Sequence, residues 1–372
     1  LLGSLIILVL GFKELGGWDE MMRVCGAVTV NDYGDTMTNL IRSNDDANFP
    51  WLGALIGSAI IGFWYWCTDQ FIVQRVLSGK NEMEARRGTI FGAYLKLLPV
   101  FLFLIPGMIA FALHQKYIGA GGEGFLPMLA NGTANADAAF PTLVAKLLPA
   151  GVKGLVVCGI LAALMSSLAS LFNSSAMLFT IDFYKRFKPE TPEKKLVGIG
   201  QIATIVIVVL GILWIPIMRS VGDVLYTYLQ DVQSVLAPGI AAAFLLGICW
   251  KRTSAQGGMW GLISGMVIGL TRLGAKVYYS NAGEVADSTF KYLFYDMNWL
   301  FFCGWMFLFC IIVVIVVSLA TEAPTAEKIQ GLVFGTATKE QKAATRASWN
   351  HWDIIHTVII LAITAAFYWY FW

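Results

Sequence analysis

The sequence predicts an all-α protein that crosses a membrane many times. The chain of 372 residues is 57% hydrophobic and only 13% charged, whereas charged residues make up about a quarter of an ordinary soluble domain. Its mean hydropathy is +0.67. Apolar runs of about 20 residues, the helical length that crosses a hydrocarbon core of ~30 Å, recur along the whole chain. We therefore expect an integral membrane protein.

These apolar runs define the elements in order. The chain opens inside one of them, LLGSLIILVLGF, with no starting Met and no signal-peptide n-region, so further sequence is expected upstream of Leu1. Counting this run, we expect about nine spans or part-spans in a single transmembrane domain over 1–372. The other runs are 52–77, 90–113, 152–183, 196–218, 222–249, 255–275, 299–320 and 353–372.

The positive charges predict how the spans are oriented. Lys and Arg concentrate in alternate links, namely those after 52–77, 152–183, 222–249 and 299–320. Cytoplasmic links carry an excess of positive charge, so these links are expected in the cytoplasm. The last of them, 321–352, is a polar cytoplasmic link before the final span. The net charge of +2 does not favour a nucleic-acid partner, and we expect none.

The run 155–183 carries small polar residues along one helical face. Ala163, Ser166, Ser167 and Ser170 recur at spacings i, i+3, i+4 and i+7, so they point the same way at mid-membrane depth. Polar groups at that depth are buried in protein or line a cavity, and converging oxygens are what a dehydrated small cation requires. A stripe of small residues is equally typical of close helix packing.

Two more polar side chains lie inside apolar spans. Lys96 lies nine residues beyond Arg87, or roughly 13 Å up a helix, where a lysine costs several kcal/mol. Its stem can instead extend back toward the cytoplasm. Gln230 lies eight residues into 222–249, and its amide suits a sugar hydroxyl or a bond between helices. Both residues are candidate ligands.

An aromatic cluster lies well inside the span 52–77. Trp64, Tyr65 and Trp66 follow Pro50 by about fourteen residues, far from the interface where aromatic residues usually gather. Flat rings in a polar cavity stack against a pyranose ring or close a passage, and packing is the alternative. No nucleotide-binding loop, nucleophile elbow or zinc spacing is present, so we expect neither an enzyme nor a cofactor.

Five segments carry a resemblance to a known family. They are WYWCTDQFIVQRVLSGKN (64–81), YLKLLPVFLFLIPGMIA (94–110), LAALMSSLASLFNSSAMLFTIDFY (161–184), LYTYLQ (225–230) and GICWKRTSAQGGMWGLISG (247–265). They resemble the sodium/solute symporters, and within them the sodium/glucose cotransporter branch. The last segment is similar to a family signature, with Gly258 where alanine is usual. The fold implied is a LeuT-like bundle of inverted repeats, with the first repeat expected upstream of Leu1.

The same resemblance implies a sodium site on 152–183. It makes the carbonyl of Ala163 and the hydroxyls of Ser166 and Ser167 sodium ligands. Ala169 stands where members that move two sodium ions have Thr, so one Na⁺ per sugar is implied. Na⁺ is then the coupling ion, not a cofactor.

The resemblance also implies a sugar site. It makes Lys96 and Gln230 ligands of sugar hydroxyls, and Tyr65 an inner gate stacked beneath the ring, with Trp66 beside it. Asp69 and Arg75 would belong to a polar network below that gate.

The implied function is secondary active transport across the plasma membrane. Inward movement of Na⁺ would drive uptake of a neutral monosaccharide of the glucose or galactose type, by alternating access within the lipid bilayer. Related symporters move myo-inositol, sialic acid or proline, and these solutes stay open. A sodium or solute sensor that keeps the fold without transport is a further alternative.

Overall fold

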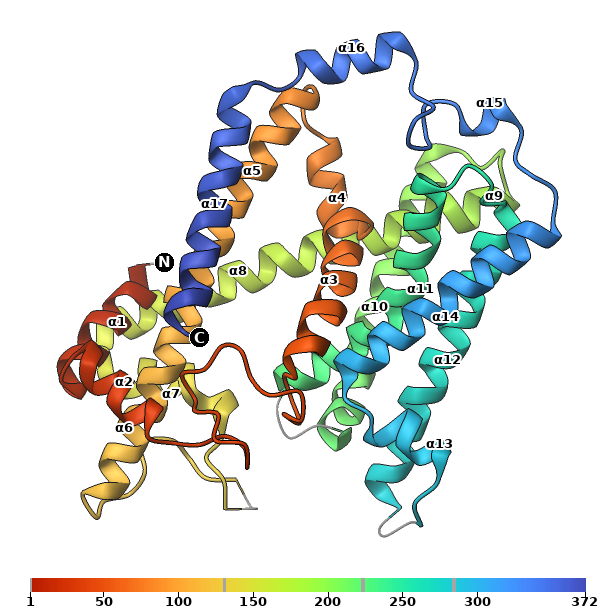
Figure 1. The fold of residues 1–372 in the computed structure, drawn as a ribbon. Coiled ribbons are helices and arrows are strands. Elements are labelled where there is room, and N and C mark those ends of the chain that lie inside the picture. Colours follow the sequence, from red (N-terminus) through yellow and green to blue (C-terminus); the bar gives the residue numbers. More distant parts are fainter. Residues whose placement is uncertain (1, 130–131, 222–224, 283–285) are drawn as a thin grey trace. The chain divides into compact units, whose positions relative to one another are not determined.

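The computed structural model describes residues 2–129, 132–221, 225–282 and 286–372, and its regular structure is helical (Figure 1). Six helical segments of this part of the chain are long and apolar enough to cross a membrane, or up to seven if one bent pair counts as a span. The prediction of an all-α, multi-span membrane protein is confirmed. The six segments are Glu82–Gly119, Ala150–Phe187, Glu193–Pro216, Leu225–Cys249, Trp299–Ala320 and His351–Tyr370.

Two of the nine predicted runs are not among the six or seven candidate spans of the structure. The opening run forms α1 (Leu2–Leu15), whose 14 residues are too few to cross the bilayer alone. The run 255–275 forms α12 (Ala255–Asn281), a continuous helix whose many glycines and two basic residues, Arg272 and Lys276, keep it outside the apolar set. The start of the predicted span 222–249 falls on 222–224, outside the described residues.

The described residues divide into two compact units. The single transmembrane domain over 1–372 stays a prediction. The first unit comprises Leu1–Leu40, Ile90–Leu213 and Ile359–Trp372, and the second comprises Ile41–Thr89 and Trp214–Val358.

In the first unit, α1, α2 (Trp18–Gly26), α6 (Ile105–Gly119) and α7 (Ala139–Leu147) enclose an apolar core. Its fully buried side chains include Ile7, Ile109, Leu113 and Leu143. Gly11 allows α1 to approach α6, because a Cβ there would lie 2.8 Å from Cγ2 of Ile109. This unit also contains α8 (Ala150–Met177), the π-helix η3 (Leu178–Tyr184), α9 (Lys185–Phe187) and most of α10 (Glu193–Val221).

The second unit is built on α3 (Trp51–Cys67), α11 (Leu225–Cys249), α12 and α14 (Trp299–Ala320), of which α11, α12 and α14 lie side by side (Figure 1). Apolar side chains of α3, α11 and α14 form its core, among them Ile60, Ala237 and Leu300. On α12 a buried glycine recurs every fourth residue, at 257, 261, 265 and 269. Small residues at this spacing let helix backbones approach closely.

Further helices complete the described residues. They are α4 (Gln70–Leu77), α5 (Glu82–Pro99), the π-helix η1 (Val100–Leu104), the 3₁₀-helix η2 (Ala136–Ala138), α13 (Thr289–Lys291), the π-helix η4 (Tyr292–Asp296), α15 (Ala326–Ile329), α16 (Lys339–Ala347) and α17 (His351–Tyr370). The polar link predicted at 321–352 thus contains α15 and α16.

Candidate functional site

The length of the run 52–77 predicts one straight helix. The structure instead has two helices, α3 and α4, with a bend of 50° between them. The bend follows from Thr68 and Asp69. The Thr68 hydroxyl and the Asp69 backbone N–H both donate to the carbonyl of Trp64, at 2.7 and 3.1 Å, which closes α3. Asp69 then begins α4 as its N-cap, because its carboxylate accepts from the N–H of Phe71 at 3.1 Å.

The bend places the aromatic cluster in the last turn of α3. The rings of Tyr65 and Trp66 meet edge to face, with centroids 5.4 Å apart. Tyr65 is half-buried, and Trp66 is 46% exposed. Of the network expected below them, Asp69 caps α4, and the guanidinium of Arg75 lies 4.7 Å from the ring centroid of Phe71. A large aromatic pair at a break between helices suits a gate.

Lys96 lies in the last turn of α5. Pro99 follows it, and the chain continues through η1 into α6. Proline removes a helical hydrogen bond, so a local change of helix type here has a clear cause. The Lys96 side chain is exposed in its unit. It is therefore not part of the apolar core of α1, α2, α6 and α7.

Ala163, Ser166 and Ser167 lie on the continuous helix α8, and all three are exposed in their unit. Ser170 and Ser174 each donate back to the carbonyl four residues earlier, at 3.1 and 2.8 Å. Within the described residues, no hydrogen bond occupies the hydroxyls of Ser166 and Ser167. Hard cations such as Ca²⁺ take about six to eight oxygen ligands, so three oxygens on one helix would supply only part of a cation's coordination shell.

Gln230 lies in the second turn of α11 and is half-buried. Its Nε2 donates to the hydroxyl of Tyr226 at 3.0 Å. The bond lies within one helix rather than between two. The ring of Tyr226 lies against that of Phe49, with centroids 6.5 Å apart, at the end where α3 and α11 both begin.

The structure places three of the predicted residues, Tyr65, Trp66 and Gln230, on the packed helices α3 and α11. From the Phe49–Tyr226 contact, α3 and α11 run in the same direction (Figure 1). Gln230 is about one turn from that contact and Tyr65 is about three turns further along the pair. Lys96, Ala163, Ser166 and Ser167 belong to the other unit.

Beside Gln230 the structure reveals an ionic cluster that we did not predict. We define the α11–α12 ionic cluster as Asp231, Arg272 and Lys276. The carboxylate of Asp231 accepts from Arg272 Nη2 at 3.3 Å on one oxygen and from Lys276 Nζ at 2.7 Å on the other. A charged residue inside a membrane segment is a functional candidate by default, and the sequence shows Asp231 and Arg272 inside apolar runs, with Lys276 directly after the second run. That signal was available.

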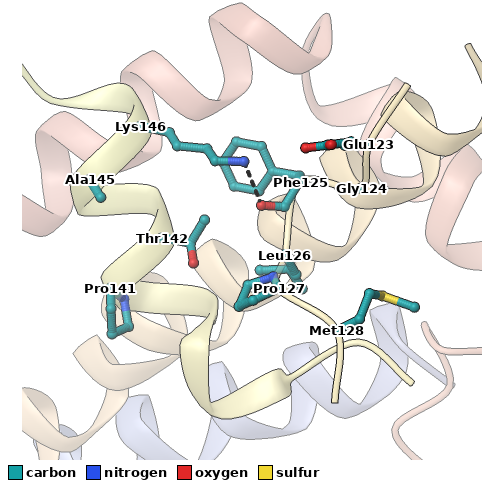
Figure 2. A pocket seen from close by; sticks show the side chains of 10 residues that line it. All are labelled: Glu123, Gly124, Phe125, Leu126, Pro127, Met128, Pro141, Thr142, Ala145 and Lys146. Atoms are coloured by element: carbon teal, nitrogen blue, oxygen red, sulfur yellow. Dashed lines mark hydrogen bonds between the residues drawn. The ribbon is translucent and has the colours of Figure 1, made fainter. Parts of the chain in front are cut away.

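A cavity of about 720 Å³ lies in the first unit, between α7 and the segment before it (Figure 2). Figure 2 shows Lys146 reaching over the ring of Phe125, and its Nζ donates to the carbonyl of Phe125 at 2.9 Å. The predicted site residues are not among those that line it. The cavity is thus separate from the candidate site.

Comparisons with known proteins test the resemblance. A sequence model of the sodium:solute symporter family matches residues 1–265. The chain is 34% identical to the sodium/mannose cotransporter of Bos taurus, over 99% of this chain and 65% of that protein. It is 34% identical to sodium/myo-inositol cotransporter 2 of Homo sapiens, over 90% of this chain and 51% of that protein.

A third relative, sodium/glucose cotransporter 1 of Ovis aries, is 36% identical over 87% of this chain and 51% of its own length. The chain spans between about half and two thirds of the length of these curated relatives. The family match covers well over half of the chain, and the predicted resemblance is confirmed. The chain belongs to the sodium:solute symporter family.

Proposed function

We propose that the protein is a secondary active transporter of the plasma membrane that couples inward Na⁺ movement to uptake of a neutral sugar. The observation that supports this most directly is the family match together with relatives named as sodium cotransporters of mannose, glucose and myo-inositol. Such a protein is not an enzyme and needs no cofactor. The fold proposed is the LeuT-like inverted-repeat bundle.

The sodium site is proposed at the carbonyl of Ala163 and the hydroxyls of Ser166 and Ser167. Their common face on α8 and the unoccupied serine hydroxyls support it. Because three oxygens fall short of a full coordination shell, further oxygens must come from another segment. Ala169 offers no side-chain oxygen at the position where relatives that move two sodium ions have Thr. The proposal is therefore one Na⁺ per sugar.

The sugar site is proposed at Lys96, Gln230, Tyr65 and Trp66. The ammonium and amide groups bind hydroxyls, and the tyrosine ring stacks beneath the sugar and closes the inner path. The separation of about three turns between Gln230 and Tyr65 along α3 and α11 suits residues that contact opposite ends of one ligand. In this proposal the 50° bend after Cys67 is where the aromatic end of α3 would move relative to α4.

Coupling follows if Na⁺ binds one state of the transporter better than the other, since equal affinity shifts no equilibrium. Each cation that moves inward through 100 mV gains about 2.3 kcal/mol. This free energy is enough to concentrate a neutral sugar roughly fortyfold.

Glucose and galactose are the solutes we favour. A polyol offers the same hydroxyl pattern to Lys96 and Gln230, and one relative is named as a myo-inositol cotransporter. Myo-inositol is therefore the second candidate solute.

The test is uptake into proteoliposomes that contain the complete protein. Labelled glucose, galactose and myo-inositol are offered under an inward Na⁺ gradient and, in parallel, an equal K⁺ gradient. Lys96→Ala and Ser167→Ala are compared with Lys188→Ala and Ser280→Ala, which replace exposed residues elsewhere. We expect Na⁺-dependent uptake that is lost in the first pair and kept in the second. Uptake that is equal in Na⁺ and K⁺ would overturn the coupling.

A further inference from the structure

The α11–α12 ionic cluster is built around a fully buried arginine. The side chain of Arg272 has no exposed surface, and that of Asp231 is 9% exposed. Besides the carboxylate, Arg272 donates to the carbonyls of Met297 at 2.8 Å and Leu293 at 3.4 Å. Its guanidinium carbon lies 4.0 Å from the ring centroid of Phe302. One side chain of α12 therefore holds α11, the segment after η4 and α14 together.

Lys276 adds a second cation to the same carboxylate. It lies one helical turn beyond Arg272, and its side chain is 22% exposed. Each oxygen of Asp231 is thus taken by a different basic residue of α12. A buried ion pair stabilises a fold little more than apolar side chains of similar size, and fixing one arrangement is its best attested use. Two contacts one turn apart along α12 fix the rotation and the axial position of α11.

Gln230 immediately precedes this fixed point. Successive residues of a helix point about 100° apart, so the direction of Asp231 determines that of Gln230. On its own face, Gln230 is held by the hydroxyl of Tyr226 one turn away, and Tyr226 lies against Phe49 of the segment before α3. A rotation of α11 large enough to redirect the Gln230 amide would break both ionic contacts of Asp231.

We propose that Asp231, held by Arg272 and Lys276, is a positioning residue that sets the orientation of Gln230 and thereby the affinity for the transported sugar. This inference rests on the proposed role of Gln230 as a sugar ligand. Asp231 itself is buried against α12 and does not contact the solute.

The experiment measures Na⁺-dependent uptake of the preferred sugar by the complete protein in proteoliposomes. Asp231→Asn keeps a side-chain acceptor of the same shape but removes the charge that holds both cations. We expect the KM for sugar to rise about tenfold, while the maximal rate per folded transporter and the Na⁺ concentration for half-maximal uptake stay within about twofold. Lys276→Gln, which leaves the Arg272–Asp231 contact intact, should give a smaller rise in KM.

A double-mutant cycle separates positioning from general stability. Once Gln230→Ala has removed the amide, adding Asp231→Asn should raise the KM no further, because the side chain that it orients is gone. Asp287→Asn is the matched control, since Asp287 also pairs with a lysine, Lys291, but its side chain is 95% exposed. This control should leave the KM unchanged.

The outcomes are distinct. If the unaltered protein shows no Na⁺-dependent sugar uptake, or if Gln230→Ala leaves the KM unchanged, the proposed function or the role of Gln230 fails, and the inference fails with it. If Gln230→Ala raises the KM but folded Asp231→Asn and Lys276→Gln do not, the inference alone is overturned. Equal and additive effects of Asp231→Asn in both backgrounds would also overturn it. If Asp231→Asn does not fold, Lys276→Gln is the test: a raised KM for sugar supports the inference, and an unchanged KM overturns it.

Discussion

Gly239 of α11 and Gly265 of α12 face each other at the helix interface: a Cβ on Gly265 would lie 3.0 Å from the Cα of Gly239. The same Cβ would lie 3.2 Å from the sulfur of Cys310 on α14. Three helices therefore meet at a point that has no room for a methyl group. This point lies about two turns along α12 from Arg272, so the glycine contact and the ionic cluster belong to the same interface.

Gly265→Ala should destabilise the protein by about 1–3 kcal/mol, because overpacking moves backbone atoms that have no flexible side chain to yield. Thermal unfolding of the purified protein in detergent measures the change. Gly258→Ala is the matched control, since a Cβ there meets nothing within 4 Å. Its effect should be neutral or stabilising by up to about 1 kcal/mol, because Ala favours helix over Gly. Equal effects of the two substitutions would contradict the packing described.

Asp69→Ala should weaken the start of α4 by about 1 kcal/mol, the usual loss when a helix N-cap is removed. Hydrogen exchange of the amides at the start of α4, which include the partner N–H of Phe71, reports the change directly. Asp69→Ser keeps an oxygen acceptor and should retain most of the protection. Unchanged exchange in Asp69→Ala would show that the cap does not hold the bend.

Tyr226→Phe removes the hydroxyl that accepts the hydrogen bond of Gln230. We expect the KM for sugar to rise two- to fivefold, less than in Gln230→Ala, because the amide remains but is held less firmly. Sugar uptake under a Na⁺ gradient gives the comparison. Tyr278→Phe, at a side chain that is 63% exposed, serves as the control. A KM for Tyr226→Phe equal to that of the unaltered protein would remove Tyr226 from the site.

Burial raises the pKa of the Cys25 thiol to about 11. Cys25 lies on α2, outside the predicted spans, and its sulfur donates to the carbonyl of Met108 at 3.7 Å. A pKa above the ordinary value leaves about one thiol in a thousand ionised at pH 8, so alkylation should be slow there and rise as the pH approaches 11. Mass spectrometry after iodoacetamide treatment at several pH values tests this. The exposed Cys249 is the reference, and equally fast labelling of Cys25 at pH 8 would refute the burial.

The fold class could be predicted because apolar length alone determines which segments cross a bilayer. The positions of the long helices follow from it, and the predicted span 299–320 coincides with α14. The bend in 52–77 did not follow from apolar length. Asp69 was assigned to a polar network, whereas a carboxylate before an apolar run is also a helix N-cap signal.

The sequence likewise predicts the local part of the candidate site but not the contacts between helices. A helical period is enough to place Ala163, Ser166 and Ser167 on one face, since the pattern is local. The cluster of Asp231 and Arg272 joins residues 41 positions apart on different helices. Spacing in the sequence cannot give such a partner. Asp231 and Arg272 are ionisable residues inside apolar runs, and this alone makes them functional candidates in the same way as Gln230.

The charges of the α11–α12 ionic cluster are unequal, and this bears on which solutes Gln230 would accept. One carboxylate faces two basic side chains, so a surplus positive charge stands beside Gln230. For any unit charge held about 8 Å from a cationic solute at an effective dielectric constant of about 20, the repulsion is about 2 kcal/mol. The repulsion lowers the occupancy of a cationic solute roughly thirtyfold and leaves a neutral polyol unaffected. If Gln230 binds the solute as proposed, the first turns of α11 would disfavour amines and amino sugars by the sign of their charge, independently of how their hydroxyls are recognised.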